Sequence, residues 1–251
     1  MSSSKSLSYY DETASKFYAK LDKHAYEKYR YELISHFLVV VYLKKTVSET
    51  KEKQKLKLLD VGSGNAFYTI GRILRKKDLR EKLEIQGSDF SSGMIKEARK
   101  LYPKTKFTVC DAQDLKFKDQ SFDVVVSREM LEHLPDKLKG LKEMHRVLKD
   151  NGKLILSTPS WFGLVAPLYF LKKRFKTMQP IDDWFTPFSL KKLLREAGFK
   201  VESLTTINYV LYHGKLPNFL VPIVKFLDKI ISFIPVLNYF GRNLIVFARK
   251  V

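Results

Sequence analysis

The chain alternates between short apolar runs and longer segments with helical periodicity. Each apolar run is brief and bounded by Gly, Asp or Pro, a pattern typical of buried strands. We expect strands at 56–61, 83–89, 106–111, 122–127, 152–158, 201–210 and 243–250. Helices are expected at 91–102, 136–150 and 186–199, the last opened by Thr186 and Pro187 and closed by Gly198. This order predicts an α/β fold, a parallel sheet with helices on both faces.

Three regions lie outside this alternation. The first is a helical pattern rich in Tyr, Leu and Lys, which ends in a polar, lysine-rich connector. We therefore expect an N-terminal helical cap at 1–55 and the main domain at 56–251. The other two are apolar insertions within that domain, at 161–180 and 216–240.

Composition narrows the class of protein. The 251 residues are 45% hydrophobic and 13% aromatic, enough for a well-buried globular core. The single cysteine, Cys110, excludes a disulfide framework or a multi-cysteine metal site, and the first residues contain no apolar leader, so we expect a cytoplasmic protein. The net charge of +19 would attract nucleic acid, anionic lipid or an acidic substrate.

A turn with two glycines follows the first expected strand. Its residues Asp60, Gly62, Ser63 and Gly64 lead toward a helix. Glycines at such a point allow a tight turn and let a ligand approach the backbone and the helix N-terminus. A dinucleotide-binding fingerprint requires a third glycine where this chain has Phe67. Because Asp60 disfavours a phosphate anion, the turn indicates a nucleoside without phosphates that carries positive charge.

Two further acids lie at expected strand ends. Asp89 ends the second strand, 25 positions after Gly64, close to the spacing at which a carboxylate accepts ribose hydroxyl groups. Asp111 ends the third strand, where it can accept from the exocyclic amine of adenine. Phe90 and Met94 supply apolar faces for the ring. One such acid is often only a helix cap, but three in series predict an adenosine site.

Four segments in order resemble the motifs of class I S-adenosylmethionine-dependent methyltransferases: LLDVGSGNAFYT, GSDFSSGMIKEA, VCDAQDLKFKDQSFDVVVSREMLEHLPD and LKDNGKLILSTPS. The resemblance covers about residues 56–160 and implies a Rossmann-like, seven-stranded, mostly parallel sheet. It also implies S-adenosyl-L-methionine as cofactor, with the methionine end at Asp60 and the glycine turn, the ribose at Asp89, and the adenine at Asp111 and Ala112. Many members have Gly where this chain has Ala66, and we expect alanine to be tolerated at a helix start.

The stretch SREMLEHLPD carries the candidate catalytic residues Glu129, Glu132 and His133. In a helix these positions share one face. EMLEH resembles the matching segment of ubiquinone-biosynthesis O-methyltransferases and of small-RNA terminal 2′-O-methyltransferases, in which E-x-x-E-H binds magnesium. Such a site would hold Mg²⁺ and acidify a coordinated hydroxyl. The alternative, which we favour, is metal-free: His133 faces the acceptor as a general base, or the turn shapes the acceptor pocket.

Both apolar insertions have a composition suited to a membrane surface. Residues 161–176 combine aromatic side chains with Lys172, Lys173 and Arg174, at the place where the quinone O-methyltransferases carry a membrane-binding insertion. In 216–240 one polar stripe crosses a broad apolar face, formed by Lys225, Asp228, Lys229 and Ser232. Its prolines and charges argue against a spanning helix. We expect peripheral contact with an anionic membrane; a substrate-pocket lid or a dimer interface is the alternative.

These features predict a cytoplasmic, membrane-peripheral methyltransferase of quinone biosynthesis, which methylates a phenolic oxygen of a lipophilic, quinone-type precursor. An RNA 2′-O-methyltransferase is one alternative, motivated by the charge of +19 and by EMLEH. Against it, the sequence carries no separate RNA-binding module and no basic patch interleaved with base-stacking aromatics. A methyltransferase-like binding protein without catalysis is the other alternative, disfavoured by the intact set of acids and glycines at the strand ends.

Overall fold

The computed structural model describes residues 8–11, 25–50, 54–161, 183–209, 217–234, 237 and 239–251. Within these residues one sheet has seven strands, in the order β3-β2-β1-β4-β5-β7-β6. The strands are β1 Leu56–Val61, β2 Leu83–Asp89, β3 Lys106–Val109, β4 Phe122–Arg128, β5 Leu148–Pro159, β6 Phe199–Ile207 and β7 Asn243–Lys250. Only β7 runs antiparallel to its neighbours, β5 and β6. The expected Rossmann-like sheet is confirmed.

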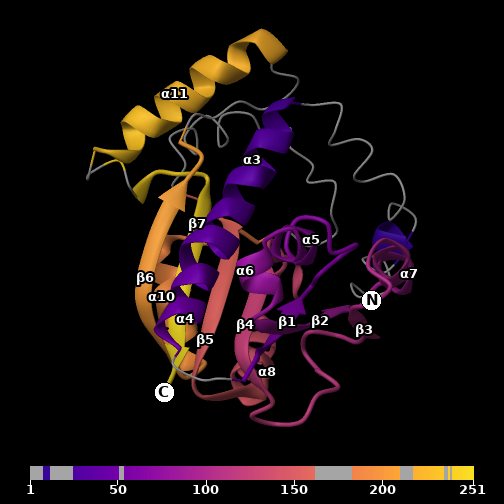
Figure 1. Ribbon diagram of the computed structural model, residues 1–251. Coiled ribbons are helices and arrows are strands. Elements are labelled where there is room, and N and C mark those ends of the chain that lie inside the picture. Colours follow the sequence, from indigo (N-terminus) through magenta and orange to yellow (C-terminus); the bar gives the residue numbers. More distant parts are fainter. Residues whose placement is uncertain are drawn as a thin grey trace.

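Helices cover both faces of the sheet (Figure 1). The helical segments are α3 Ala25–Ser35, the π-helical η1 His36–Leu43, α4 Lys44–Glu49, α5 Ile70–Leu74, α6 Lys77–Arg80, α7 Ser92–Leu101, η2 Leu131–His133, α8 Lys137–Val147, α10 Pro187–Glu196, η3 Asn218–Leu220 and α11 Val221–Ser232. One core cluster joins α3, η1, α4, α5 and α6 to the sheet, and another joins α8 and α10 to the opposite face.

The alternation of side chains along β1 explains why both faces are apolar. Leu56 and Leu58 belong to the core beneath α3, whereas Leu59 and Val61 belong to the core beneath α8 and α10. Successive strand residues point to opposite faces, so a strand covered on both sides reads as a continuous apolar run. This is the signal that located the strands in the sequence.

The sequence predicted the elements better than their bounds. β3 ends at Val109, so Asp111 follows the strand as a loop residue instead of ending it. The glycine turn does not enter a helix directly, because α5 begins only at Ile70. The domain boundary expected at residue 55 stays a prediction.

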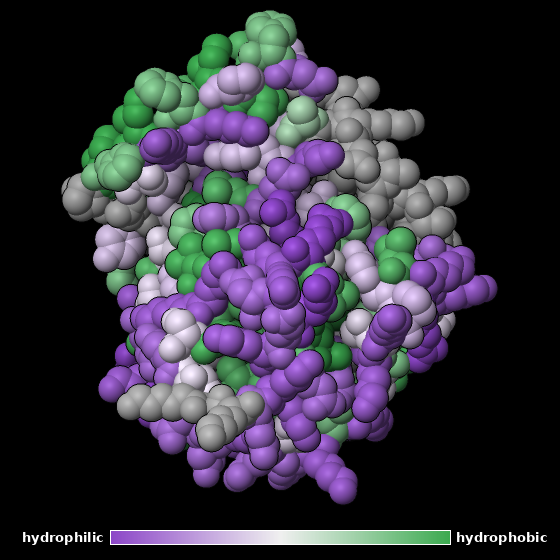
Figure 2. Space-filling model, viewed as in Figure 1, coloured by the Kyte–Doolittle hydropathy of each residue, from purple (hydrophilic) through white to green (hydrophobic). Residues whose placement is uncertain are grey.

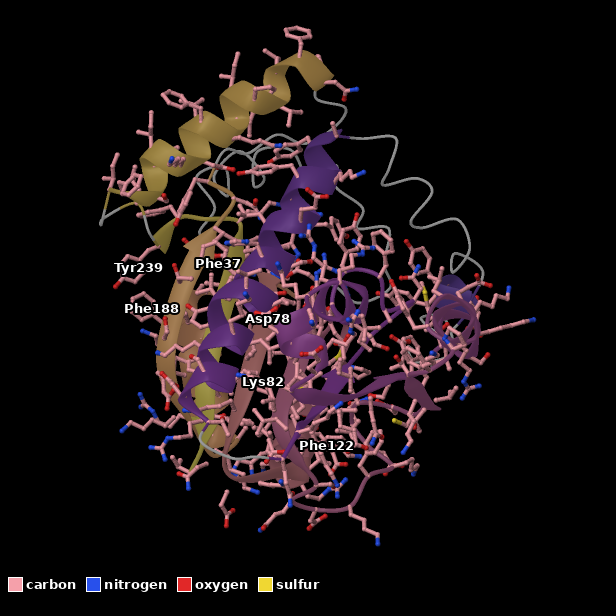
Figure 3. The ribbon with its side chains drawn as sticks, viewed as in Figure 1. Phe37, Asp78, Lys82, Phe122, Phe188 and Tyr239 are labelled. Carbon is pink, nitrogen blue, oxygen red and sulfur yellow. The ribbon has the colours of Figure 1, made fainter. Side chains whose placement is uncertain are left out.

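The two apolar insertions differ in how much of them is described. Apart from Trp161, the segment 161–180 lies outside the described residues. Most of 216–240 is described and forms η3 and α11. Phe122, the first residue of β4, lies at the end of the sheet away from α11 (Figure 3), so α11 lies toward the carboxyl ends of the parallel strands. Among the described residues, no helix is long and apolar enough to cross a bilayer.

Candidate functional site

A cavity of about 270 Å³ lies at the carboxyl ends of β1, β2 and β4. Parallel α/β sheets bind ligands at this edge, because the loops that leave the strands converge there. The cavity brings together most of the residues predicted from the sequence: Gly62, Ser63, Gly64, Asp89, Phe90, Met94, Asp111, Ala112, Glu129, Glu132 and His133. Asp60 is not among its lining residues.

The glycine turn needs its glycines. Gly62 and Gly64 have φ angles of 73° and 53°, in the left-handed region that favours glycine. A Cβ atom on Gly62 would lie 2.3 Å from Cγ of Met130. The backbone N–H groups of Gly62 and Ser63 both donate to the carbonyl of Ser88, at 2.8 and 2.9 Å, and so tie the turn to β2.

Ala66 departs from what the sequence indicated. It has a φ of 67° and lies before α5, so it does not start a helix. The expectation that Ala66 lies at a helix start was wrong. A left-handed conformation costs an L-residue about 1–2 kcal/mol, because the Cβ atom comes too close to the following carbonyl oxygen.

Two backbone N–H groups hold the carboxylate of Asp89 at the cavity. One carboxylate oxygen accepts from the Gly64 N–H at 2.8 Å, and the other accepts from the Ser91 N–H at 2.9 Å. Each oxygen keeps a further lone pair, so the carboxylate can still accept from hydroxyl groups. Burial raises the pKa of Asp89 to about 6, although the hydrogen bonds from Ser91 and Gly64 act to lower it.

Asp60 lies behind the turn instead of lining the cavity. It is fully buried, and neither carboxylate oxygen has a hydrogen-bond partner among the described residues. Burial raises its pKa to about 8, while the charge of Arg128 opposes the rise and that of Asp89 adds to it. With this raised pKa, Asp60 is largely protonated at neutral pH when no ligand is bound, and a cation placed nearby would favour its ionised form.

The N-terminal segment 8–11 also reaches this site. Oδ1 of Asp11 accepts from the Gly93 N–H at 2.9 Å and from the Ser91 hydroxyl, at the start of α7. The Tyr10 ring lies edge-on to Phe90, with ring centroids 5.4 Å apart. Sequence analysis missed Tyr10, because no periodicity or spacing relates 8–11 to strand ends so distant in the chain.

The three candidate catalytic residues do not share a helical face. Only Leu131–His133 is helical, as η2, and Glu129 precedes it with a φ of 48°. That expectation was wrong. Oε2 of Glu129 accepts from the Asn243 side chain at 2.8 Å, whereas Oε2 of the buried Glu132 accepts from the Thr158 hydroxyl at 3.0 Å.

The surroundings of His133 do not form a metal site. Its Nε2 atom lies 3.6 Å from Oε1 of Glu132, and its ring lies 6.2 Å from that of Tyr10. Among the described residues, no group of three or more His, Cys, Asp or Glu side chains is arranged to hold a metal ion. The geometry therefore does not support the magnesium interpretation.

A second part of the cavity is lined by arginines and aromatic rings that the sequence did not single out. They are Arg30 and Tyr31 of α3, Tyr68, Arg128, Trp184 and Arg242. The guanidinium of Arg128 lies against two adjoining rings, 4.5 Å from the centroid of Tyr31 and 4.9 Å from that of Tyr68. Burial by itself would lower the pKa of Arg30. The negative charges of Glu27, which accepts hydrogen bonds from Arg30, and of Glu129 outweigh that effect, so the pKa of Arg30 is raised.

Known proteins similar to this chain agree with the geometry. Residues 59–156 match a methyltransferase domain family. The demethylmenaquinone methyltransferase of Lysinibacillus sphaericus is 32% identical over 201 residues, which cover 72% of this chain and 84% of the relative. The ubiquinone/menaquinone biosynthesis C-methyltransferase UbiE of Rickettsia bellii is 36% identical over 104 residues, covering 39% and 42%.

Solved structures share the fold at lower identity. One is a chain of the complex between the Haloferax volcanii Trm112 methyltransferase activator and a methyltransferase, with a TM-score of 0.61, 20% identity and coverage of 96% of this chain and 97% of that one. Another is an S-adenosylmethionine-dependent methyltransferase of Thermotoga maritima, with a TM-score of 0.56, 20% identity and coverage of 90% and 95%. The chain therefore belongs to the class I S-adenosylmethionine-dependent methyltransferases and is an enzyme of that family.

Proposed function

We propose that this enzyme transfers a methyl group from S-adenosyl-L-methionine to a carbon of a quinol-type, lipophilic ring, at a membrane surface. The observation that carries the proposal is that one cavity joins the predicted adenosine site to a compartment walled by tyrosines, a tryptophan and arginines. Aromatic walls suit a flat apolar ring. The names of the relatives, which act in menaquinone and ubiquinone biosynthesis, support the same class of acceptor.

The residues of the cofactor part fit the proposed cofactor. The glycine turn lines the cavity, Asp89 keeps lone pairs for a ribose, and Phe90 and Met94 line the place for an adenine with Asp111 and Ala112. When bound, S-adenosyl-L-methionine supplies a methyl group made electrophilic by a sulfonium. A sulfonium cation near Asp60 would lower the raised pKa of its carboxyl group and favour the ionised form. The enzyme contributes chiefly by holding an acceptor in line with the methyl group.

Two arguments favour carbon over the phenolic oxygen expected from the sequence. The first is the name of the Rickettsia bellii relative, a C-methyltransferase. The second is chemical: an ionised ring hydroxyl shares its negative charge with neighbouring ring carbons, so either atom can be methylated. Arginines such as Arg30 and Arg128 would hold the oxygen by charge-assisted hydrogen bonds. An oxygen held in this way leaves the ring carbon to face the methyl group.

The outward face of α11 supports the membrane part of the proposal. Ile223, Phe226 and Ile230 are 53%, 63% and 43% exposed, and Phe219 and Phe233 beside the helix are each 75% exposed. These side chains form an apolar surface over α11, which is green in Figure 2. The exposed Lys225 and Lys229 lie on the same helix. Apolar side chains beside lysines suit an anionic membrane.

Methyl transfer to a soluble quinol tests the proposal. The enzyme would be incubated with S-adenosyl-L-methionine labelled in the methyl group and with a naphthoquinol of short side chain, and the product analysed by NMR. We expect a ring-bound methyl group, and unchanged turnover when a chelator is added, since no metal takes part. Label on oxygen would contradict the carbon assignment. Turnover that needs Mg²⁺ would restore the metal interpretation, and label transferred only to RNA would contradict the acceptor class.

A further inference from the structure

We propose that Arg128 and Glu129 form a two-sided subsite for the ionisable hydroxyl of the acceptor ring. In this subsite Glu129 removes the hydroxyl proton and Arg128 holds the oxygen anion that results. The inference rests on the proposed function, because it assumes a hydroxylated ring in the cavity. It assigns a role to Arg128, which sequence analysis did not single out, and a partner to Glu129.

The backbone brings these two neighbouring side chains to the same face of the sheet. Successive residues of a strand point to opposite faces, and Arg128, the last residue of β4, points toward Tyr31 of α3. The left-handed φ of Glu129 breaks the alternation. Its carboxylate hydrogen-bonds Asn243 and is close enough to Arg30 of α3 to raise the pKa of that arginine. Both side chains therefore lie toward α3.

Each side chain is held on one side and unpaired on the other. The rings of Tyr31 and Tyr68 hold the guanidinium of Arg128, yet its buried Nε and Nη2 atoms make no hydrogen bond within the described part of the chain. Asn243 holds Oε2 of Glu129, while the buried Oε1 atom has no partner there. Leaving a buried polar group unpaired is unfavourable, so a ligand that supplies the missing partners binds more tightly.

A ring hydroxyl supplies both partners at once. Its hydrogen can be donated to Oε1 of Glu129, and its oxygen can accept from Arg128. A carboxylate would be repelled by Glu129, and an ammonium group by Arg128. Asn243 itself is fixed, because its side-chain oxygen accepts from the Asn208 amide at 2.9 Å. The orientation of the Glu129 carboxylate is therefore set before the acceptor binds.

The proton transfer balances over one turnover. The O–H bond breaks, its proton goes to Glu129, and its electron pair stays on the oxygen and the adjoining ring carbon. Arg128 stabilises the anion through charge-assisted hydrogen bonds. After methylation, the proton of the methylated carbon restores the hydroxyl group, and the proton on Glu129 leaves to solvent. The net release is one proton for each methyl group transferred.

Two naphthyl probes test the subsite by calorimetry on enzyme saturated with S-adenosylhomocysteine. The hydroxyl of 1-naphthol is neutral at pH 7 and that of 2-hydroxy-1,4-naphthoquinone is ionised. Glu129→Gln should weaken 1-naphthol about tenfold, since the carboxylate acceptor is lost, but should tighten the ionised quinone, since a like charge is removed. Arg128→Met should weaken the ionised quinone about tenfold to a hundredfold, the range for a lost charged hydrogen bond.

Two control variants make the outcome decisive. Glu132→Gln removes an acid of the same cavity that Thr158 already holds, so it should not shift the two probes in opposite directions. If Arg128→Met loses affinity for S-adenosylhomocysteine, Arg128→Lys, which keeps the positive charge, is used in its place. Equal shifts of both probes in Glu129→Gln, or none, would overturn the subsite. If the wild-type enzyme binds neither probe, the proposed ring acceptor is wrong and the subsite falls with it.

Discussion

At the residue scale, backbone angles decide several features of the site. Gly62, Gly64, Ala66 and Glu129 all have positive φ angles, and all lie at the carboxyl ends of β1 and β4. Glycine adopts such angles without cost, whereas alanine and glutamate do not. Strain of this kind is typical of ligand sites, where the surrounding structure holds residues in conformations that a free chain avoids. The carboxylate of Glu129 lines the cavity.

The strain at Ala66 can be measured by comparison with a second alanine. Ala66→Gly removes a buried methyl group, worth about 0.8 kcal/mol, and makes the unfolded chain more flexible, but it also relieves the left-handed angle. We expect a free energy of unfolding within about 0.5 kcal/mol of wild type. Ala98→Gly, in α7 of the same core cluster, relieves nothing and should lose about 1.5 to 2 kcal/mol. Guanidinium unfolding measures both; equal losses would mean that Ala66 is unstrained.

At the element scale, α11 carries large apolar residues on its outer face as well as toward the protein. Its buried residues are Val221, Val224 and Asp228, and Asp228 accepts from the Tyr29 hydroxyl of α3 at 3.0 Å. Lys225 lies 5.2 Å from the centroid of the Tyr29 ring. The stick view shows side chains of α11 projecting away from the rest of the molecule (Figure 3). The expected polar stripe exists, and part of it faces the protein while large apolar residues face outward. Such a helix gains stability when its outer face leaves water.

Vesicle flotation tests whether lipid covers α11. The wild-type protein should float with vesicles that contain anionic lipid, and added salt should weaken binding, because each basic residue near the surface contributes about 1 kcal/mol. Phe226→Asp should lower the partition coefficient at least tenfold, since burying a phenylalanine is worth about 1.5–3 kcal/mol. Phe188, on α10, is an exposed phenylalanine like Phe226; Phe188→Asp is therefore the matched control and should bind as wild type.

Two results would contradict the membrane assignment of α11. One is a wild-type protein that stays in the soluble fraction at low salt. The other is self-association of the wild-type protein in analytical ultracentrifugation, together with a monomeric Phe226→Asp variant. The outer face of α11 would then be a dimer interface. The net charge of +19 argues against that second outcome, because two such chains repel each other.

At the scale of the whole molecule, charge links the stability of the fold to its ligand. The chain carries +19, yet the cofactor edge buries two acids whose pKa values are raised, Asp60 to about 8 and Asp89 to about 6. Their ordinary value is 3.8, so the folded enzyme without ligand keeps protons that the unfolded chain releases above about pH 4. The contribution of these acids to stability is therefore full below that pH and is lost as the pH rises toward 8. A bound cation opposes the loss.

Asp60→Asn isolates this effect. Asparagine cannot release a proton, so the plot of unfolding free energy against pH should become flatter by up to about 1.4 kcal/mol per pH unit between pH 5 and 7. Urea unfolding at several pH values measures the slope. Asp114→Asn, an exposed acid ion-paired with Lys116, is the control and should leave the slope between pH 5 and 7 unchanged. A slope in Asp60→Asn equal to that of wild type would mean that Asp60 is ionised throughout.

The sequence by itself determined the sheet and the cofactor edge of this protein. Strands covered on both faces are apolar along their whole length, and helices repeat at a different period, so local pattern located both. Parallel strands place their carboxyl ends at one edge, so Asp89, Asp111 and the glycine turn were brought together without knowledge of any contact. These predictions needed only periodicity and chain direction.

Only the tertiary structure decided the acceptor side. Arg30 and Tyr31 reach Arg128 because α3 crosses the sheet, and nothing local in the sequence relates residues so far apart. Spacing suggested a helical face for Glu129. Instead its backbone angle is left-handed, and it hydrogen-bonds Ser157 on β5 and Asn243 on β7, which periodicity does not reveal. Burial of Asp60 and the outward apolar face of α11 likewise depend on what packs against them. Local pattern determines elements, whereas long-range packing determines which side chains meet.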